Sequence, residues 1–170
     1  MDPHASTPGT LPPGTLAGGL LRVVLEGEAP ARLSPLGEAD RAQAVADLAD
    51  ANVFGLPGRR GPYVLHLSVQ EGRLVFDVRD AADAPLQTFV LALGPFRGLL
   101  KDYQLLVDSH MLAVQEGREA RMEAIDMGRR ALHNEGAALL TERLAGKIDV
   151  DTETARRIFT LVCVMHGLTE

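Results

Sequence analysis

Apolar and polar residues alternate between positions 63 and 79, on both sides of a Glu71-Gly72 pair. The apolar positions are Tyr63, Leu65, Leu67, Val69, Leu74, Phe76 and Val78. A period of two places these side chains on one face of a strand, and a two-residue turn joins antiparallel strands, so the pattern predicts a β-hairpin. A third strand is predicted in PLQTFVLAL (residues 85–93), which follows the turn-like segment DAADAP. The three strands together would form a β-meander.

The periodicity becomes helical after Pro95, a residue that suits the first position of a helix. One face of this helix carries Leu99, Leu100, Tyr103, Leu106, Val107 and Met111. Gly117 interrupts the pattern, and a second long helix is predicted over residues 119–144, before Gly146. The two helices are expected to form an antiparallel hairpin.

The last helix is predicted to start after Asp151, a good N-cap residue, and to run to His166. Its segment from Ile158 to Met165 is apolar nearly all round. A helix of this kind is buried, so we expect it at the centre of the helical layer.

The first third of the chain gives weaker signals. Residues 20–28 form a short β-branched run typical of a strand, and residues 38–52 have apolar positions at helical spacing. Residues 1–19 contain four Pro and four Gly with little to bury, which predicts a disordered tail.

Residues 20–170 are therefore predicted to form a single domain. We predict an α+β fold, in which a small antiparallel sheet (the β-meander) packs against a C-terminal three-helix layer.

The chain carries a net charge of −6, from 17 basic and 23 acidic residues. It therefore lacks the basic surplus on which nonspecific nucleic-acid binding depends. The sequence shows no secretory signal pattern, and its apolar runs are far shorter than the roughly 20 residues that cross a bilayer. We expect a cytoplasmic protein without membrane association.

Motifs for cofactors and metals are absent from the sequence. The five His residues never lie four apart, and the lone Cys163 falls in an apolar run, as a core residue would. No Walker loop, dinucleotide fingerprint or nucleophile elbow occurs, so neither a cofactor nor a metal is expected. The basic pairs at residues 59–60 and 156–157 are interpreted as a loop and a solvated helix face.

The segment EAIDMGRRALHNEG (residues 123–136) holds the main candidate site. On a helix, Asp126, Arg129, Arg130, His133 and Asn134 fall on one face, because they are spaced at i, i+3, i+4, i+7 and i+8. Asp126 and Arg130 are expected to form an ion pair across one helical turn.

The predicted helical hairpin would bring Asp102 to the level of His133, since both lie roughly 22–24 Å from the turn at 1.5 Å per residue. A cluster of Asp102, Arg129, Arg130 and His133 could hold a phosphate or carboxylate, with His133 as an acid or base. The alternative is an interhelical salt-bridge network without a ligand. The sequence alone favours this alternative.

Two glycines interrupt the opposite, apolar face of the same helix. Gly128 and Gly136 alternate there with Ile125, Leu132 and Leu139. Each glycine costs about 1 kcal/mol relative to Ala, so their place on this face suggests that a neighbouring helix packs unusually close. The alternative is that one of them ends a shorter helix.

The hairpin supplies a secondary candidate site. Pairing Gln70 with Arg73 across the turn places His66 opposite Asp77, on the face away from the apolar residues. A carboxylate beside an imidazole could orient a general base. The alternative, a solvated pair of little energetic consequence, is favoured.

Five segments resemble an uncharacterised protein family of alphaproteobacteria, numbered 0262. They are VFDVRD, PFRGLLKDY, EAIDMGRRALHNEG, ERLAGKI and TARRIFTLVCVMH. The resemblance covers roughly residues 20–166 and implies a bacterial cytoplasmic protein. It implies no activity, cofactor or catalytic residue.

We expect a noncatalytic binding or regulatory module that engages a protein or a small anionic ligand, and that could assemble as a homo-oligomer. The feature behind this expectation is a polar helix face without a complete catalytic motif. A small enzyme for a phosphorylated or carboxylated substrate is the second hypothesis. Specific RNA binding is the third, although no aromatic stacking platform is visible.

Overall fold

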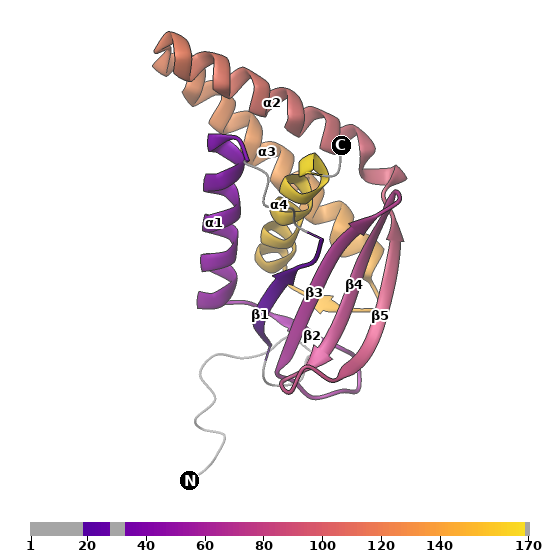
Figure 1. Ribbon diagram of the computed structural model, residues 1–170. Coiled ribbons are helices and arrows are strands. Elements are labelled where there is room, and N and C mark those ends of the chain that lie inside the picture. The colour runs from indigo at the N-terminus through magenta and orange to yellow at the C-terminus, as the bar shows by residue number, and fades with distance from the viewer. Residues whose placement is uncertain (1–18, 28–32, 169–170) are drawn as a thin grey trace.

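The structure, a computed structural model, describes residues 19–27 and 33–168. A four-stranded sheet and a layer of helices form most of this part of the chain (Figure 1). The sheet packs against the C-terminal helices, so the predicted α+β class is confirmed. The predicted tail, apart from Gly19, lies outside the described residues.

The predicted meander forms the larger part of the sheet: β3 (Tyr63–Gln70), β4 (Arg73–Asp80) and β5 (Pro85–Ala92). Glu71 and Gly72 both have positive φ, +51° and +76°, as a type I′ hairpin turn requires. The register is the predicted one, since Gln70 pairs with Arg73. Most apolar residues of β3 and β4 are buried and form part of the hydrophobic core.

The sheet is mixed rather than purely antiparallel, because β1 (Leu20–Leu25) adds to β3 in parallel. Parallel neighbours need a crossover connection, and α1 (Pro35–Asp50) lies in the connection between these strands. Ser34 caps α1 by accepting a 3.0 Å hydrogen bond from the Gly37 backbone N–H. The sequence shows the strand but not this pairing, because strands forty residues apart share no turn.

A second, two-stranded sheet joins distant parts of the chain. β2 (Phe54–Gly55) pairs antiparallel with β6 (Asp149–Val150). Close by, Thr154 Oγ1 accepts a 2.8 Å hydrogen bond from the Val53 backbone N–H. These contacts fix the end of α1 beside the start of the last helix.

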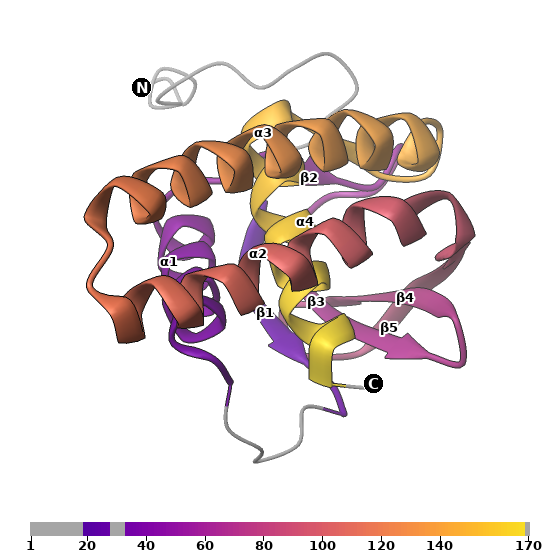
Figure 2. The same cartoon turned by 90° about the horizontal axis from the view of Figure 1, so that it is seen from above.

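The predicted helical hairpin consists of α2 (Arg97–Glu116) and α3 (Glu119–Leu144). Gly117 adopts the left-handed conformation at the turn, with φ +68°. Pro95 lies in a short 3₁₀ helix, η1 (Gly94–Phe96), that leads into α2. Figure 2 shows the two long helices running side by side.

The last helix, α4 (Thr152–Leu168), lies between α1 and α3 and also contacts α2 and β3 (Figures 1 and 2). Asp151 caps it, with Oδ1 accepting a 2.8 Å hydrogen bond from the Thr154 backbone N–H. Every residue from Ile158 to Met165 is buried, which confirms the predicted central position. Over residues 19–27 and 33–168, no helix combines the length and apolar character that a membrane crossing requires.

Helices α3 and α4 approach each other closely at Gly136 of α3. A Cβ atom built there would lie 2.2 Å from the ring of Phe159, a fully buried residue of α4. This confirms the predicted close packing at Gly136, and α3 continues through both glycines. At Gly128 the prediction is wrong, because the same construction meets only Leu106, at an ordinary 3.5 Å.

We expect Gly136→Ala to destabilise the protein by about 1–3 kcal/mol, because the added methyl overpacks the Phe159 ring. Gly128→Ala is the matched control on the same helix. It should leave stability unchanged or raise it by up to about 1 kcal/mol, since Ala favours the helix and has room. Urea unfolding of both variants measures the difference. Equal effects would contradict a specific role for Gly136.

Candidate functional site

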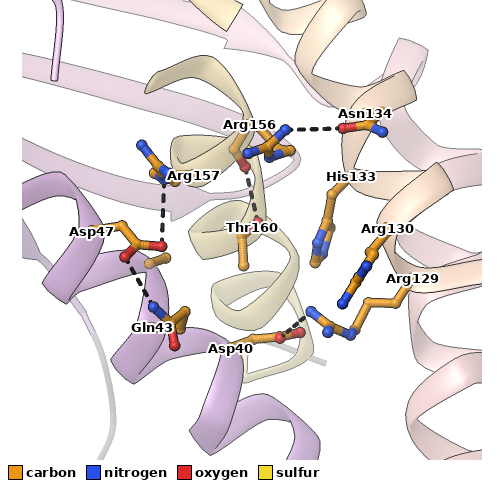
Figure 3. A pocket seen from close by; sticks show the side chains of 11 residues that line it. Asp40, Gln43, Asp47, Arg129, Arg130, His133, Asn134, Arg156, Arg157 and Thr160 are labelled. Carbon is orange, nitrogen blue, oxygen red and sulfur yellow. Dashed lines mark hydrogen bonds and ion pairs between the residues drawn. The ribbon is translucent and has the colours of Figure 1, made fainter. Parts of the chain in front are cut away.

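A pocket of about 390 Å³ opens between α1, α3 and α4 (Figure 3). Helix α1 contributes polar or charged groups and one alanine, α3 supplies four residues and α4 three. Its lining consists of Asp40, Gln43, Ala44, Asp47, Arg129, Arg130, His133, Asn134, Arg156, Arg157 and Thr160. Four arginines therefore face two carboxylates in a space large enough for a small molecule.

Asp40 anchors the inner end of the pocket. It is 4% exposed, and its two carboxylate oxygens accept hydrogen bonds from Tyr103 Oη at 2.6 Å and Arg129 Nη1 at 2.7 Å. Burial raises the pKa of Asp40, while the bond from Tyr103 and the charge of Arg129 oppose that rise. A buried carboxylate needs such partners, so Asp40 fixes the position of Arg129.

The predicted polar face of α3 forms one wall. Arg129 also pairs with Asp126, which in turn contacts Arg130 at 3.2 Å, as predicted for residues four apart. The hydrogen bond from Arg129, followed by the charges of both arginines, lowers the pKa of Asp126. Asp126 lies behind the lining, whereas the Arg130 side chain is 74% exposed at the rim. Arg130 is therefore open to a ligand from solvent.

His133 lies at the inner end of the same wall and is 4% exposed. Its ring packs against Tyr103 and Phe159, with centroid distances of 5.7 and 6.5 Å. Burial lowers the pKa of His133 to about 4, helped by the charges of Arg129 and Arg156, so the imidazole is neutral near pH 7. Its Nε2 atom is buried and has no hydrogen-bond partner within the described part of the chain. Buried polar atoms without a partner are rare in folded proteins.

The wall from α4 carries Arg156 and Arg157, which we interpreted from sequence as a solvated helix face. That interpretation is wrong, because both side chains line the pocket and are two-thirds or more buried. Arg156 donates to Asn134 Oδ1 at 3.3 Å and pairs with Glu153. Arg157 reaches its nearest carboxylates, those of Asp47 and Glu153, only at 3.5 Å.

Charge is divided between the walls. All four arginines come from α3 and α4, and both lining carboxylates come from α1. Asp47 also accepts a 2.9 Å hydrogen bond from Gln43, a neighbour on α1. The pocket can therefore hold an anionic group on one side and hydrogen-bond donors on the other.

Asp102 is not part of this pocket. The helical hairpin brings it to the level of Glu135, but both line a groove on the outer side of α2 and α3. The neighbouring Tyr103 faces inward instead and reaches Asp40. Of the six predicted residues, the structure brings Arg129, Arg130, His133 and Asn134 together in the lining, with Asp126 behind them.

The wall from α1 was not predicted from the sequence. Its signal was a charged residue within an apolar stripe: Asp40 lies at four-residue spacing with Leu36, Ala44 and Leu48, all buried. A carboxylate at such a position needs a buried partner, although the sequence does not show that Arg129 supplies it.

His66, the secondary candidate, lies opposite Asp77 in the predicted register, but their side chains have other partners. His66 Nδ1 lies 2.5 Å from Glu26 Oε2, and its Nε2 lies 2.9 Å from Asp83 Oδ1. Asp77 instead pairs with Arg79 at 2.8 Å. The hydrogen bond from His66 is the largest cause of a lowered Asp83 pKa.

This second cluster connects the end of β1 and the β4–β5 turn to the middle of β3. None of its residues lines the pocket between α1, α3 and α4. Within the described ranges, no group of three or more His, Cys, Asp and Glu side chains has an arrangement that could hold a metal ion.

We expect acid to destabilise the protein through His133. Its pKa is about 4 in the folded chain and near 6.5 when unfolded, so the unfolded chain binds more protons between these values. Stability is therefore lost as pH falls through this window, by about 2 kcal/mol between pH 7 and pH 5. His133→Phe should remove this loss. It should keep the raised pKa of Asp40, which makes the folded state more stable as pH falls. Urea unfolding at both pH values tests the difference, and equal losses in both proteins would contradict it.

The sequence matches the model of one protein family, described as Uncharacterised protein family (UPF0262), over residues 18–167. A UPF0262 protein of Granulibacter bethesdensis is 66% identical over 156 residues, which cover 86% of this chain and 89% of the relative. Those of Acidiphilium cryptum and Rhodospirillum rubrum are 60% and 52% identical, covering 89% and 80% of this chain and 94% and 84% of theirs. No solved structure matches. The chain belongs to the UPF0262 family, as the five sequence segments had indicated.

Proposed function

We propose that this protein is a noncatalytic cytoplasmic binding or regulatory module that takes up a small anionic ligand between α1, α3 and α4. The observation that carries the proposal is the convergence of four arginines from two helices on one pocket of about 390 Å³. Guanidinium groups bind carboxylates and phosphates through paired hydrogen bonds.

The existing ion pairs leave room for such a ligand. Among the described residues, Arg157 contacts carboxylates at 3.5 Å, and the mostly exposed Arg130 pairs with Asp126. Arg129, by contrast, is held by Asp40 and Asp126 and acts as a fixed part of the wall. A bound anion would add hydrogen bonds to the two loosely held arginines without breaking the buried Asp40 pair.

A small enzyme for a phosphorylated or carboxylated substrate is the second candidate, favoured by the unpartnered Nε2 of His133. Binding ranks first because a pKa of about 4 makes His133 a weak general base near neutral pH. Asp40, the nearest buried carboxylate, is already occupied by Tyr103 and Arg129. Release of inorganic phosphate from glucose 6-phosphate incubated with the protein would favour the enzyme.

Arg157→Gln should weaken the binding of inorganic phosphate by about 10- to 100-fold, because a hydrogen bond to a charged group contributes roughly 1.5–3 kcal/mol. Isothermal titration calorimetry at low ionic strength measures the affinity. Arg121→Gln is the matched control, since Arg121 is an exposed residue of α3 outside the pocket lining. No phosphate binding to the wild type, or equal losses in both variants, would contradict an anion site in this pocket.

A further inference from the structure

We infer that the ligand is a small phosphate monoester bearing several hydroxyl groups, of the sugar-phosphate class. This inference rests on the proposed anion pocket and adds to it which part of the ligand faces which wall. Three features of the lining carry it: its size, the separation of its charges and the unpartnered imidazole at its inner end.

The size of the pocket exceeds what an inorganic anion fills. A volume of about 390 Å³ corresponds to roughly thirteen water molecules at about 30 Å³ each. Phosphate alone has five heavy atoms and would leave most of this space to water. A hexose phosphate has sixteen heavy atoms, a number close to those roughly thirteen waters, so its sugar can enter the pocket while its phosphate lies at the opening.

The arginines place the anionic group at the rim on the α3 and α4 side. Arg130 and Arg157 have N–H donors to spare there. At the inner end, Arg129 is already paired with the buried carboxylate of Asp40, and this pair offers a second anionic group little net positive charge. The ligand part that enters deeply is therefore uncharged.

The remaining lining groups suit hydroxyls. Asp47 and Gln43 of α1 and Asn134 of α3 offer carboxylate and amide atoms, which can accept from or donate to the hydroxyls of a polyol. Thr160 uses its own hydroxyl proton in a 2.9 Å bond to the Arg156 carbonyl, so its oxygen remains able to accept. Figure 3 shows these side chains around the same space as the arginines.

His133 is the group that distinguishes such a ligand from a bare anion. It is neutral, 96% of it is covered, and its Nε2 has no partner within the described residues. A neutral imidazole nitrogen either accepts from or donates to a hydroxyl, which can serve in both roles. A ligand hydroxyl would satisfy this atom after a small shift of the side chains that now cover it.

The test compares inorganic phosphate, glucose and glucose 6-phosphate by isothermal titration calorimetry. Glucose 6-phosphate should bind at least tenfold more tightly than phosphate, and glucose alone should bind far more weakly than either. His133→Phe keeps an aromatic ring between Tyr103 and Phe159. It should weaken glucose 6-phosphate binding about threefold to tenfold and leave phosphate binding unchanged.

Asp47→Asn gives an independent readout on a half-buried side chain whose replacement should not affect folding. It should raise the affinity for phosphate, because a negative charge beside Arg157 is removed. It should lower the ratio of glucose 6-phosphate affinity to phosphate affinity, because a neutral amide binds a ligand hydroxyl less strongly than a carboxylate does. Equal affinities for phosphate and glucose 6-phosphate would overturn the inference and leave the anion pocket standing. Tighter binding of a zwitterion such as glutamate would also overturn it. Failure of all these anions to bind would remove the proposed function as well.

Discussion

The contact between Gly136 and Phe159 is the constraint on which the helical layer depends. Without a Cβ on α3, the Phe159 ring can lie directly against that helix, and α4 takes its central place. Arg156 and Thr160 flank Phe159 on α4 and then face the space toward α1. The same ring supports one side of the His133 imidazole. One missing methyl group thus sets both the packing of α4 and the inner end of the pocket.

A second constraint acts across three helices. Asp40 of α1 accepts hydrogen bonds from Tyr103 of α2 and Arg129 of α3. Burying this carboxylate costs desolvation energy that its partners offset only when the geometry is good. Such a network adds less to stability than an apolar contact of similar size would, but it permits few arrangements of its members. We attribute to this network the fixed spacing between α1, which carries the carboxylates of the pocket, and α3, which carries two of its arginines.

The sequence predicts the parts of this structure that depend on local periodicity. The Glu71-Gly72 turn, the strand register and the extents of the two long helices follow from residues near one another in the chain. The glycines of α3 predicted that another helix packs closely, but not at which glycine, since of the two only Gly136 has such a contact. The parallel pairing of β1 and the walls of the pocket do not, because they join segments separated by forty to more than one hundred residues. Asp102 illustrates the limit: the hairpin geometry gives its height along the helices, but its neighbour Tyr103 takes the inward face.

The walls of the pocket come from opposite ends of the described chain, α1 before residue 51 and α4 after residue 151. A molecule that bridges them can bind only when both ends are in place, so its binding energy adds to the free energy of unfolding. At a concentration one hundred times its dissociation constant, the gain is about 2.7 kcal/mol. A higher concentration of such a ligand would then lower the fraction of unfolded protein. Because proteases cleave the unfolded chain, the protein would persist longer when the ligand is abundant.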